Sequence, residues 1–191
     1  MSAGEVAQVW SVDDIENAVI GAVGRMMAED RHLMLYDCSE MAIIHRVAVY
    51  LEGAFPGHGH SVDCEYNRNL HATKRVQLPG QPHPTTRTRP DLVIHKRGLY
   101  GHYNSLFAME AKKVDNPDDV EDDYDKLRAL RDGVHAYDVV AFLLLKSRPE
   151  DTKDPIGATL AFGRDRPVLA FPDTAPALSR GDWWRHDRNG N

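Results

Sequence analysis

Hydrophobic residues recur along the chain with two different periods, which separate predicted helices from predicted strands. Residues 12–30 carry apolar side chains at helical spacing after an aspartate-rich start, so we expect a helix there. A second helix is expected to begin after Ser39, a residue type that caps the first turn well. The apolar stripe of this second helix contains Ile44, Val47, Leu51 and Phe55.

The middle of the chain has the two-residue period of strands. Residues 61–67 alternate between apolar and polar side chains, which predicts a half-buried strand. Residues 69–89 form a loop long enough to be either functional or flexible. The segments 91–97 and 105–113 flank a glycine-containing connection, and together they predict an antiparallel hairpin.

The second half of the chain predicts one more helix and several strands. Asn116 and Pro117 are suited to the start of a third helix, and the apolar run 139–147 indicates a central strand. Shorter strands are expected at 157–163 and 166–172, before a polar tail at 180–191. No repeat or break in composition divides the chain, so we expect a single α/β or α+β domain over its 191 residues.

Composition agrees with one globular domain, because 42% of the residues are hydrophobic and 27% are charged. No apolar run is long enough to span a bilayer, and the N-terminus lacks the basic and apolar segments of a signal peptide. We therefore expect a cytoplasmic protein with no membrane partner. The two cysteines, Cys38 and Cys64, are too few for a disulfide framework.

Charge is distributed unevenly along the chain. The net charge of −6 argues mildly against a protein that coats nucleic acid by charge alone. Residues 66–97, however, contain seven basic side chains and Asp91 as their only acid. Basic side chains around a single acid could bind a polyanion above a metal site. The alternative is a basic loop that is simply solvated.

Two carboxylates and an amine are predicted to converge at the ends of neighbouring strands. Glu110 and Lys112 point to one face of their strand, about 7 Å apart along it, and Leu106 and Ala108 are expected on that same face. In a hairpin, Asp91 would lie near them. Buried carboxylates repel each other unless a cation lies between them, and oxygen ligands without cysteine favour Mg²⁺ or Mn²⁺.

These residues resemble the signature of the PD-(D/E)XK nuclease superfamily. Pro90-Asp91 is similar to its PD element, and Glu110-Ala111-Lys112 is similar to its ExK element. The resemblance covers about residues 39–147 and implies a restriction-endonuclease-like αβββαβ core, with a mixed sheet flanked by helices. The N-terminal helix and the C-terminal strands would be additions to that core.

The resemblance implies hydrolysis of phosphodiester bonds in nucleic acid, with DNA as the expected substrate, by an endonuclease or exonuclease. Asp91, Glu110 and the Ala111 carbonyl would hold Mg²⁺ or Mn²⁺, and Glu40 matches a further acid that family members often supply. Lys112 would orient or deprotonate the attacking water. Candidate contacts to the nucleic-acid backbone are Arg68, Lys74, Arg75, Arg87, Arg89 and Lys126.

Several alternatives stay open at this point. Glu40 is either a metal ligand or only a first-turn carboxylate that favours the helix N-terminus. Glu65 is an auxiliary ligand or an exposed strand acid, and Trp183-Trp184 either pack or stack on bases. The domain as a whole is a nuclease, a hydrolase of RNA or of small phosphate esters, or a silent module that binds nucleic acid or protein. The oligomeric state is open, a homodimer included.

Overall fold

The computed structural model describes most of the chain between Trp10 and Arg180. The described residues are 10–55, 59–69, 71–99, 104–113, 120–147, 156–163, 168–172 and 179–180. Within these ranges no helix combines the length and the apolar character needed to cross a lipid bilayer. The predictions for the Asn116-Pro117 helix start and for Trp183-Trp184 fall outside the described residues.

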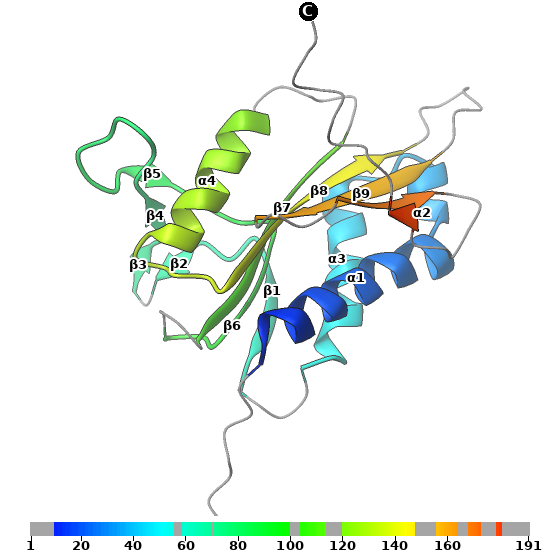
Figure 1. The fold of residues 1–191 in the computed structure, drawn as a ribbon, viewed down its shortest axis with the longest axis horizontal. Coiled ribbons are helices and arrows are strands. Elements are labelled where there is room, and N and C mark those ends of the chain that lie inside the picture. Colours follow the sequence, from blue (N-terminus) through cyan, green and yellow to red (C-terminus); the bar gives the residue numbers. More distant parts are fainter. Residues whose placement is uncertain are drawn as a thin grey trace, which may run out of the picture.

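A mixed sheet forms the centre of the described structure, with the strand order β1-β6-β7-β8-β9-β10-β11 (Figure 1). Neighbouring strands run antiparallel, except that β7 and β8 are parallel. The strands of this sheet are β1 Ser61–Cys64, β6 Leu92–His95, β7 Ser105–Lys113, β8 Val139–Lys146, β9 Gly157–Phe162, β10 Leu169–Pro172 and β11 Ser179–Arg180.

Two short hairpins interrupt the segment between β1 and β6. In the first, β2 (Arg68–Asn69) pairs with β3 (Ala72–Thr73), and in the second, β4 (Arg75–Val76) pairs with β5 (Thr86–Arg87). The loop predicted over residues 69–89 is therefore partly ordered into strands. Figure 1 shows both hairpins on the same side of the sheet as α4.

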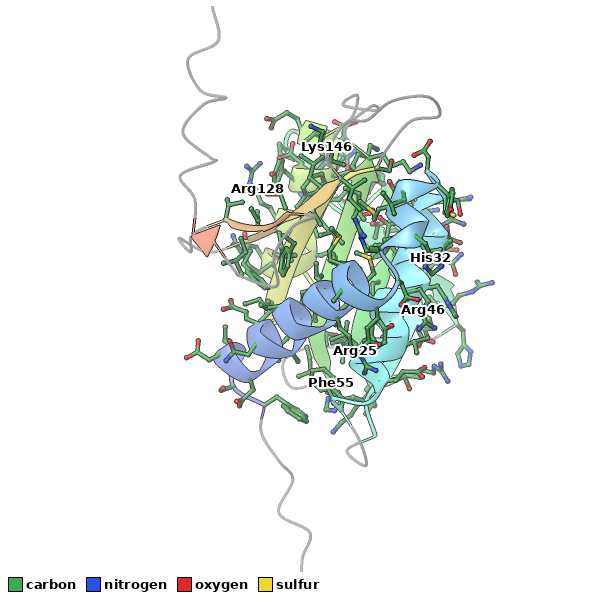
Figure 2. All side chains as sticks on the ribbon, turned by 90° about the vertical axis from the view of Figure 1, so that its right-hand side faces the viewer. Arg25, His32, Arg46, Phe55, Arg128 and Lys146 are labelled. Atoms are coloured by element: carbon green, nitrogen blue, oxygen red, sulfur yellow. The ribbon has the colours of Figure 1, made fainter. Side chains whose placement is uncertain are left out.

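Helices cover both faces of the sheet (Figure 1). Helix α1 (Val12–Glu29) and helix α3 (Glu40–Glu52) pack on one face, with the short α2 (His32–Leu35) between them in the chain. Figure 2 shows α1 lying across that face, with Arg25 of α1 and Arg46 of α3 close to where the two helices meet. Helix α4 (Val120–Asp132) packs on the other face.

An apolar cluster lies on each face of the sheet. The larger one buries the predicted stripe of α3, including Ile44, Val47 and Leu51, against α1 and the sheet. The smaller one packs Leu127 and Leu130 of α4 against the sheet residues Val93, Ala108, Val140 and Phe142. The predicted mixed α/β fold is thus confirmed at this level. Its identity as a restriction-endonuclease-like fold stays a prediction.

Two details of the predicted strands are wrong. The first strand ends at Cys64, because Glu65 has a φ of 50°, a left-handed conformation that cannot continue a strand. Leu106 was expected beside Ala108 but packs in the larger cluster on the opposite face. A register shift of the β6–β7 pair at His95 accounts for this change of face.

Candidate functional site

The predicted catalytic residues meet at one end of the β6–β7 hairpin. Leu92 pairs with Met109 across the antiparallel strands, so Asp91, one residue before, lies opposite Glu110, one residue after. Lys112 lies two residues beyond Glu110 and therefore shares the face of the sheet that α4 covers. The hairpin alone thus brings together the two carboxylates and the amine.

Asp91 is fixed in place by both neighbouring segments. Its Oδ2 accepts a hydrogen bond from the backbone N–H of Ala111 at 2.7 Å, and its carboxylate also accepts one from the carboxyl group of Glu110. The carbonyl oxygen of Asp91 accepts a third bond, from the backbone N–H of Glu65 at 3.1 Å. The orientation of this carboxylate is therefore set by the sheet rather than by solvent.

Glu110 is only 7% exposed, and this burial changes its protonation. Burial, followed by repulsion from Asp91 and Asp123, raises the pKa of Glu110 to about 9. Burial also raises the pKa of Asp91, against the opposing effect of the Ala111 hydrogen bond. A cation bound between the two carboxylates would take the place of the proton that the raised pKa of Glu110 keeps there at neutral pH.

Lys112 forms an ion pair with a residue of helix α4. Its Nζ lies 3.3 Å from Oδ2 of Asp123, while Oδ1 of Asp123 lies 2.8 Å from Nζ of Lys126. Asp123 is 4% exposed, so it is a buried carboxylate between two amines. Asp123 therefore holds the amines of both Lys112 and Lys126, and the Lys126 charge opposes the rise in the pKa of Glu110.

Asp123 is one of many acids near the start of α4, and it was not among the predicted site residues. A signal was present in the spacing, because Asp123 falls on the same helical stripe as the buried Leu127 and Leu130. An aspartate on the apolar stripe of an amphipathic helix needs a buried partner. That partner is Lys112.

Glu40 reaches the same site from the opposite layer, at the first turn of α3. Burial, followed by repulsion from Asp91, raises the pKa of Glu40, while the Lys112 charge and the backbone N–H of Lys113 act in the other direction. Ser39 caps this helix by accepting the backbone N–H of Ala42 at 3.3 Å. Glu40 is therefore both a first-turn carboxylate and an electrostatic neighbour of the site.

Lys113 lies on the opposite face of β7 from its neighbour Lys112. Its side chain points to the α3 face, where Nζ lies 2.6 Å from Oδ1 of Asp37 and 3.2 Å from the Asp37 carbonyl. Ser147 also donates to Asp37, so this contact joins the ends of β7 and β8 to the α2–α3 connection. These contacts give Lys113 a structural role.

The oxygen donors at this site are of the kind that Mg²⁺ and Mn²⁺ prefer. Within the described ranges, however, no three Asp, Glu, His or Cys side chains lie close enough together to form a metal site unaided. The carboxylates of Asp91 and Glu110 would supply two ligands. Mg²⁺ characteristically keeps several waters and takes phosphate oxygens, so a pair of protein carboxylates fits its binding mode.

The six residues predicted to contact a nucleic-acid backbone lie in different surroundings. Arg68, Arg75 and Arg87 are exposed on the two short hairpins. Arg89 is exposed and pairs with Glu65 at 3.1 Å, while Lys126 pairs with Asp123. The sixth residue, Lys74, needs a correction.

Lys74 is buried and cannot reach a nucleic-acid backbone from its position. It is 3% exposed, and its Nζ donates to the hydroxyl group of Tyr137 at 2.6 Å. The amine also lies 5.4 Å from the ring centre of Tyr66 and 5.0 Å from that of Tyr137. Burial lowers the pKa of Lys74 to about 8, as expected for an amine removed from water. Its role is to anchor the base of the hairpins.

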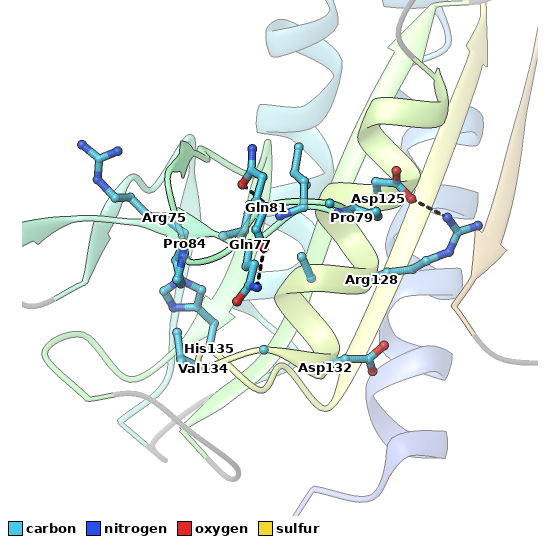
Figure 3. Close-up of a pocket in the computed structure, with 15 residues that line it drawn as sticks. Arg75, Gln77, Pro79, Gln81, Pro84, Asp125, Arg128, Asp132, Val134 and His135 are labelled. Carbon is cyan, nitrogen blue, oxygen red and sulfur yellow. Dashed lines mark hydrogen bonds and ion pairs between the residues drawn. The ribbon is translucent and has the colours of Figure 1, made fainter.

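A cavity of about 430 Å³ lies between the β4–β5 hairpin and the C-terminal half of α4 (Figure 3). Its polar lining includes Gln77, Gln81 and His135, and an ion pair between Asp125 and Arg128 at 2.6 Å borders it. Asp91, Glu110 and Lys112 are absent from its lining. The carboxylate site, at the ends of the inner strands β6 and β7, is therefore separate from this cavity.

Comparison with protein-family models finds no match to the chain. Comparisons with curated proteins and with solved structures find no match either.

Proposed function

We propose that the chain is a metal-dependent nuclease of the PD-(D/E)XK type, which hydrolyses phosphodiester bonds of nucleic acid. The observation that carries the proposal is the meeting of Asp91, Glu110 and Lys112 at the end of β7, with Glu40 approaching from the other layer. Burying like charges together lowers stability, and a catalytic metal site gives a reason to keep them there.

In this proposal Asp91 and Glu110, with the Ala111 carbonyl, would hold Mg²⁺ or Mn²⁺, which when bound polarises the scissile phosphate and a water molecule. The hydrogen bond from the Ala111 backbone N–H to Asp91 keeps one carboxylate in position before the substrate arrives. Glu40 adds negative charge on the α3 side of the same site.

Lys112 supplies the positive charge and the proton-transfer group. Its amine, held by Asp123 at 3.3 Å, would orient the attacking water and offset the charge that develops on the phosphate in the transition state. Asp123 would act as a positioning residue, since it touches Lys112 rather than the substrate. DNA is the proposed substrate.

A binding module without catalysis is the second candidate, and one observation favours it. The polar groups of the site already satisfy one another, because Glu110 bonds to Asp91, Asp91 bonds to Ala111 and Lys112 pairs with Asp123. The polar groups of the site thus have partners even without a metal ion. Catalysis therefore has to be tested directly.

A cleavage assay on circular plasmid, linear duplex, single-stranded DNA and RNA, each with Mg²⁺, Mn²⁺ or EDTA, separates these candidates. The nuclease proposal expects metal-dependent products from at least one polymer, carrying 5′-phosphate and 3′-hydroxyl ends. Binding to a polymer without cleavage under any metal condition supports the module instead.

A further inference from the structure

Two arginines face each other across the β4–β5 hairpin. Arg75 pairs directly with Arg87 in the antiparallel register, so both side chains leave the hairpin on the same face. The neighbouring pair, Val76 and Thr86, points to the other face, where Val76 is buried against the smaller apolar cluster. Like charges directly opposite each other in a hairpin are destabilising unless an anion balances them.

The protein does not supply that anion within the described residues. Across that part of the chain, neither Arg75 nor Arg87 forms an ion pair, whereas Arg89 pairs with Glu65 and Arg25 pairs with Glu29. One Nη of Arg75 donates to the carbonyl of Thr85 at 2.5 Å, which leaves its positive charge uncompensated. From Tyr66 to Pro90 the sequence has five basic residues and no acid, in a chain whose net charge is −6.

Hydrogen bonds and buried contacts at the base of the hairpin hold this arginine pair in place. The backbone N–H of Lys74 donates to Asn67 at 2.7 Å, and its carbonyl accepts from Thr88 at 3.1 Å. Its side chain is buried against Tyr137, and His135 bonds to the carbonyl of Arg75 at 2.8 Å. Because strand side chains alternate, burying Lys74 directs Arg75 outward, and Figure 3 shows its guanidinium group pointing away from α4.

The hairpin is also tied to the carboxylate site through the chain itself. The segment that carries it leaves the sheet at Glu65 and returns at Asp91, and these two residues share a backbone hydrogen bond at 3.1 Å. Arg87 is four residues from Asp91, at most about 14 Å along an extended chain. Successive phosphates of one strand rise about 3.4 Å along a duplex, so this span corresponds to about four nucleotides.

We infer that Arg75 and Arg87 form a phosphate-binding clamp for a polynucleotide, which engages the backbone up to about four nucleotides away from the phosphodiester held at Asp91 and Glu110. The inference rests on the proposed function, because that proposal makes nucleic acid the ligand. It narrows the substrate from any phosphate ester to a polynucleotide. A small phosphate ester ends at the scissile group and cannot reach the clamp, whereas a nucleic-acid strand can.

The test is equilibrium binding in EDTA, where no cleavage occurs. Fluorescence anisotropy with a 20-base-pair DNA duplex, the matching RNA duplex and a labelled dinucleotide gives affinities over a series of NaCl concentrations. The variant is Arg75→Gln/Arg87→Gln. The matched control is Arg25→Gln/Arg31→Gln, which removes two exposed arginines from the helical layer on the other face. Thermal melting checks that each variant is folded.

For the better-bound duplex, the clamp variant should lose at least about 10-fold in affinity, and its slope of log affinity against log salt should fall by about 2. The control should keep the wild-type slope, and dinucleotide binding should stay equally weak throughout. If the double variant does not fold, Arg75→Gln and Arg87→Gln are tested singly, and each should lower the slope by about 1.

The clamp would be overturned if Arg75→Gln/Arg87→Gln kept the wild-type slope of log affinity against log salt. An equal loss of affinity in the control variant would overturn it too. Absence of duplex binding by the wild-type protein would overturn it as well. Because binding is measured without metal, failure of the clamp is distinguishable from failure of the nuclease proposal. A reduced slope without any cleavage by the wild type would keep the clamp and reject the nuclease.

Discussion

The amine of Lys112 lies 3.3 Å from the carboxylate of Asp123, in an ion pair that joins the end of β7 to the first turns of α4. Asp123 also holds Lys126, at 2.8 Å. A single buried carboxylate thus fixes the one lysine that the proposed chemistry needs. The pair also makes the position of Lys112 depend on the position of α4.

Asp123→Asn should lower both activity and stability. Loss of the charge leaves two partly buried amines without their shared partner, so we expect the free energy of unfolding to fall by about 1–3 kcal/mol. The cleavage rate constant should fall at least about 10-fold with little change in KM, because Asp123 does not touch substrate. Urea unfolding and steady-state kinetics measure the two effects.

The control for Asp123 lies two residues further along the same helix. Asp125 pairs with Arg128 at 2.6 Å, but that arginine side chain is 60% exposed. Asp125→Asn should therefore change the free energy of unfolding by less than about 1 kcal/mol and leave cleavage near the wild-type rate. Equal effects of the two substitutions would contradict a special role for Asp123.

Lys112→Ala should remove cleavage while nucleic-acid binding persists. A positioned proton-transfer group contributes about 100-fold or more to rate, so the loss should reach at least that size. Lys113→Ala is the matched control, because its amine contacts Asp37 on the opposite face and should affect stability more than rate. Gel shift and cleavage assays separate the two outcomes. Undiminished cleavage by Lys112→Ala would remove this lysine from the mechanism.

Glu110 gives the metal-free protein a characteristic pH dependence. Its pKa is about 9 in the folded state against 4.5 as the ordinary value, so folding takes up a proton between those two pH values. Raising the pH through this window therefore favours the unfolded state, by at most about 1.4 kcal/mol per pH unit. Chemical unfolding in EDTA should show the decline, and Glu110→Gln should flatten it.

Addition of Mn²⁺ should reverse the decline for the wild type, because the cation stabilises the ionised carboxylates. The exposed Glu52 at the end of α3 provides the control, and Glu52→Gln should keep the wild-type pH dependence. A wild-type slope that survives in Glu110→Gln would show that another group causes it.

Glu40→Gln distinguishes a metal-site residue from a helix-end carboxylate. As a member of the site, Glu40 repels Asp91, so its neutralisation should raise the melting temperature in EDTA while cleavage falls steeply. Glu121 is an exposed carboxylate in the first turn of α4 and is the matched control. If Glu40 acts only on its helix, both substitutions should cost less than about 1 kcal/mol and leave the cleavage rate unchanged.

Much of the fold follows from the sequence pattern. The stripe of α3 was predictable because it buries side chains at helical spacing. The strands β6, β7 and β8 were predictable because each is a short, almost continuously buried apolar run. The face of Leu106 was not, since a shift of register leaves no periodic mark before pairing is known. The left-handed turn at Glu65 was missed for a similar reason, because glutamate gives no signal of a positive φ.

The residues of the candidate site that the β6–β7 pairing brings together could be predicted from the sequence. The residues that depend on the packing of other elements on the sheet could not. Asp91, Glu110 and Lys112 follow from strand alternation and pairing alone. Asp123 and the burial of Lys74 depend instead on how α4 and the hairpins dock on the sheet. Composition alone cannot tell an exposed lysine from one buried against Tyr137.

The decisive experiment for the nuclease proposal is cleavage of supercoiled plasmid with Mg²⁺ by the wild-type protein and by Asp91→Ala purified in the same way. We expect nicked or linear plasmid with the wild type, no product in EDTA, and at least about a 100-fold loss of rate for Asp91→Ala with its fold intact. Equal cleavage by the two proteins, or no cleavage of any nucleic acid by a correctly folded wild type with Mg²⁺ or Mn²⁺, would contradict it.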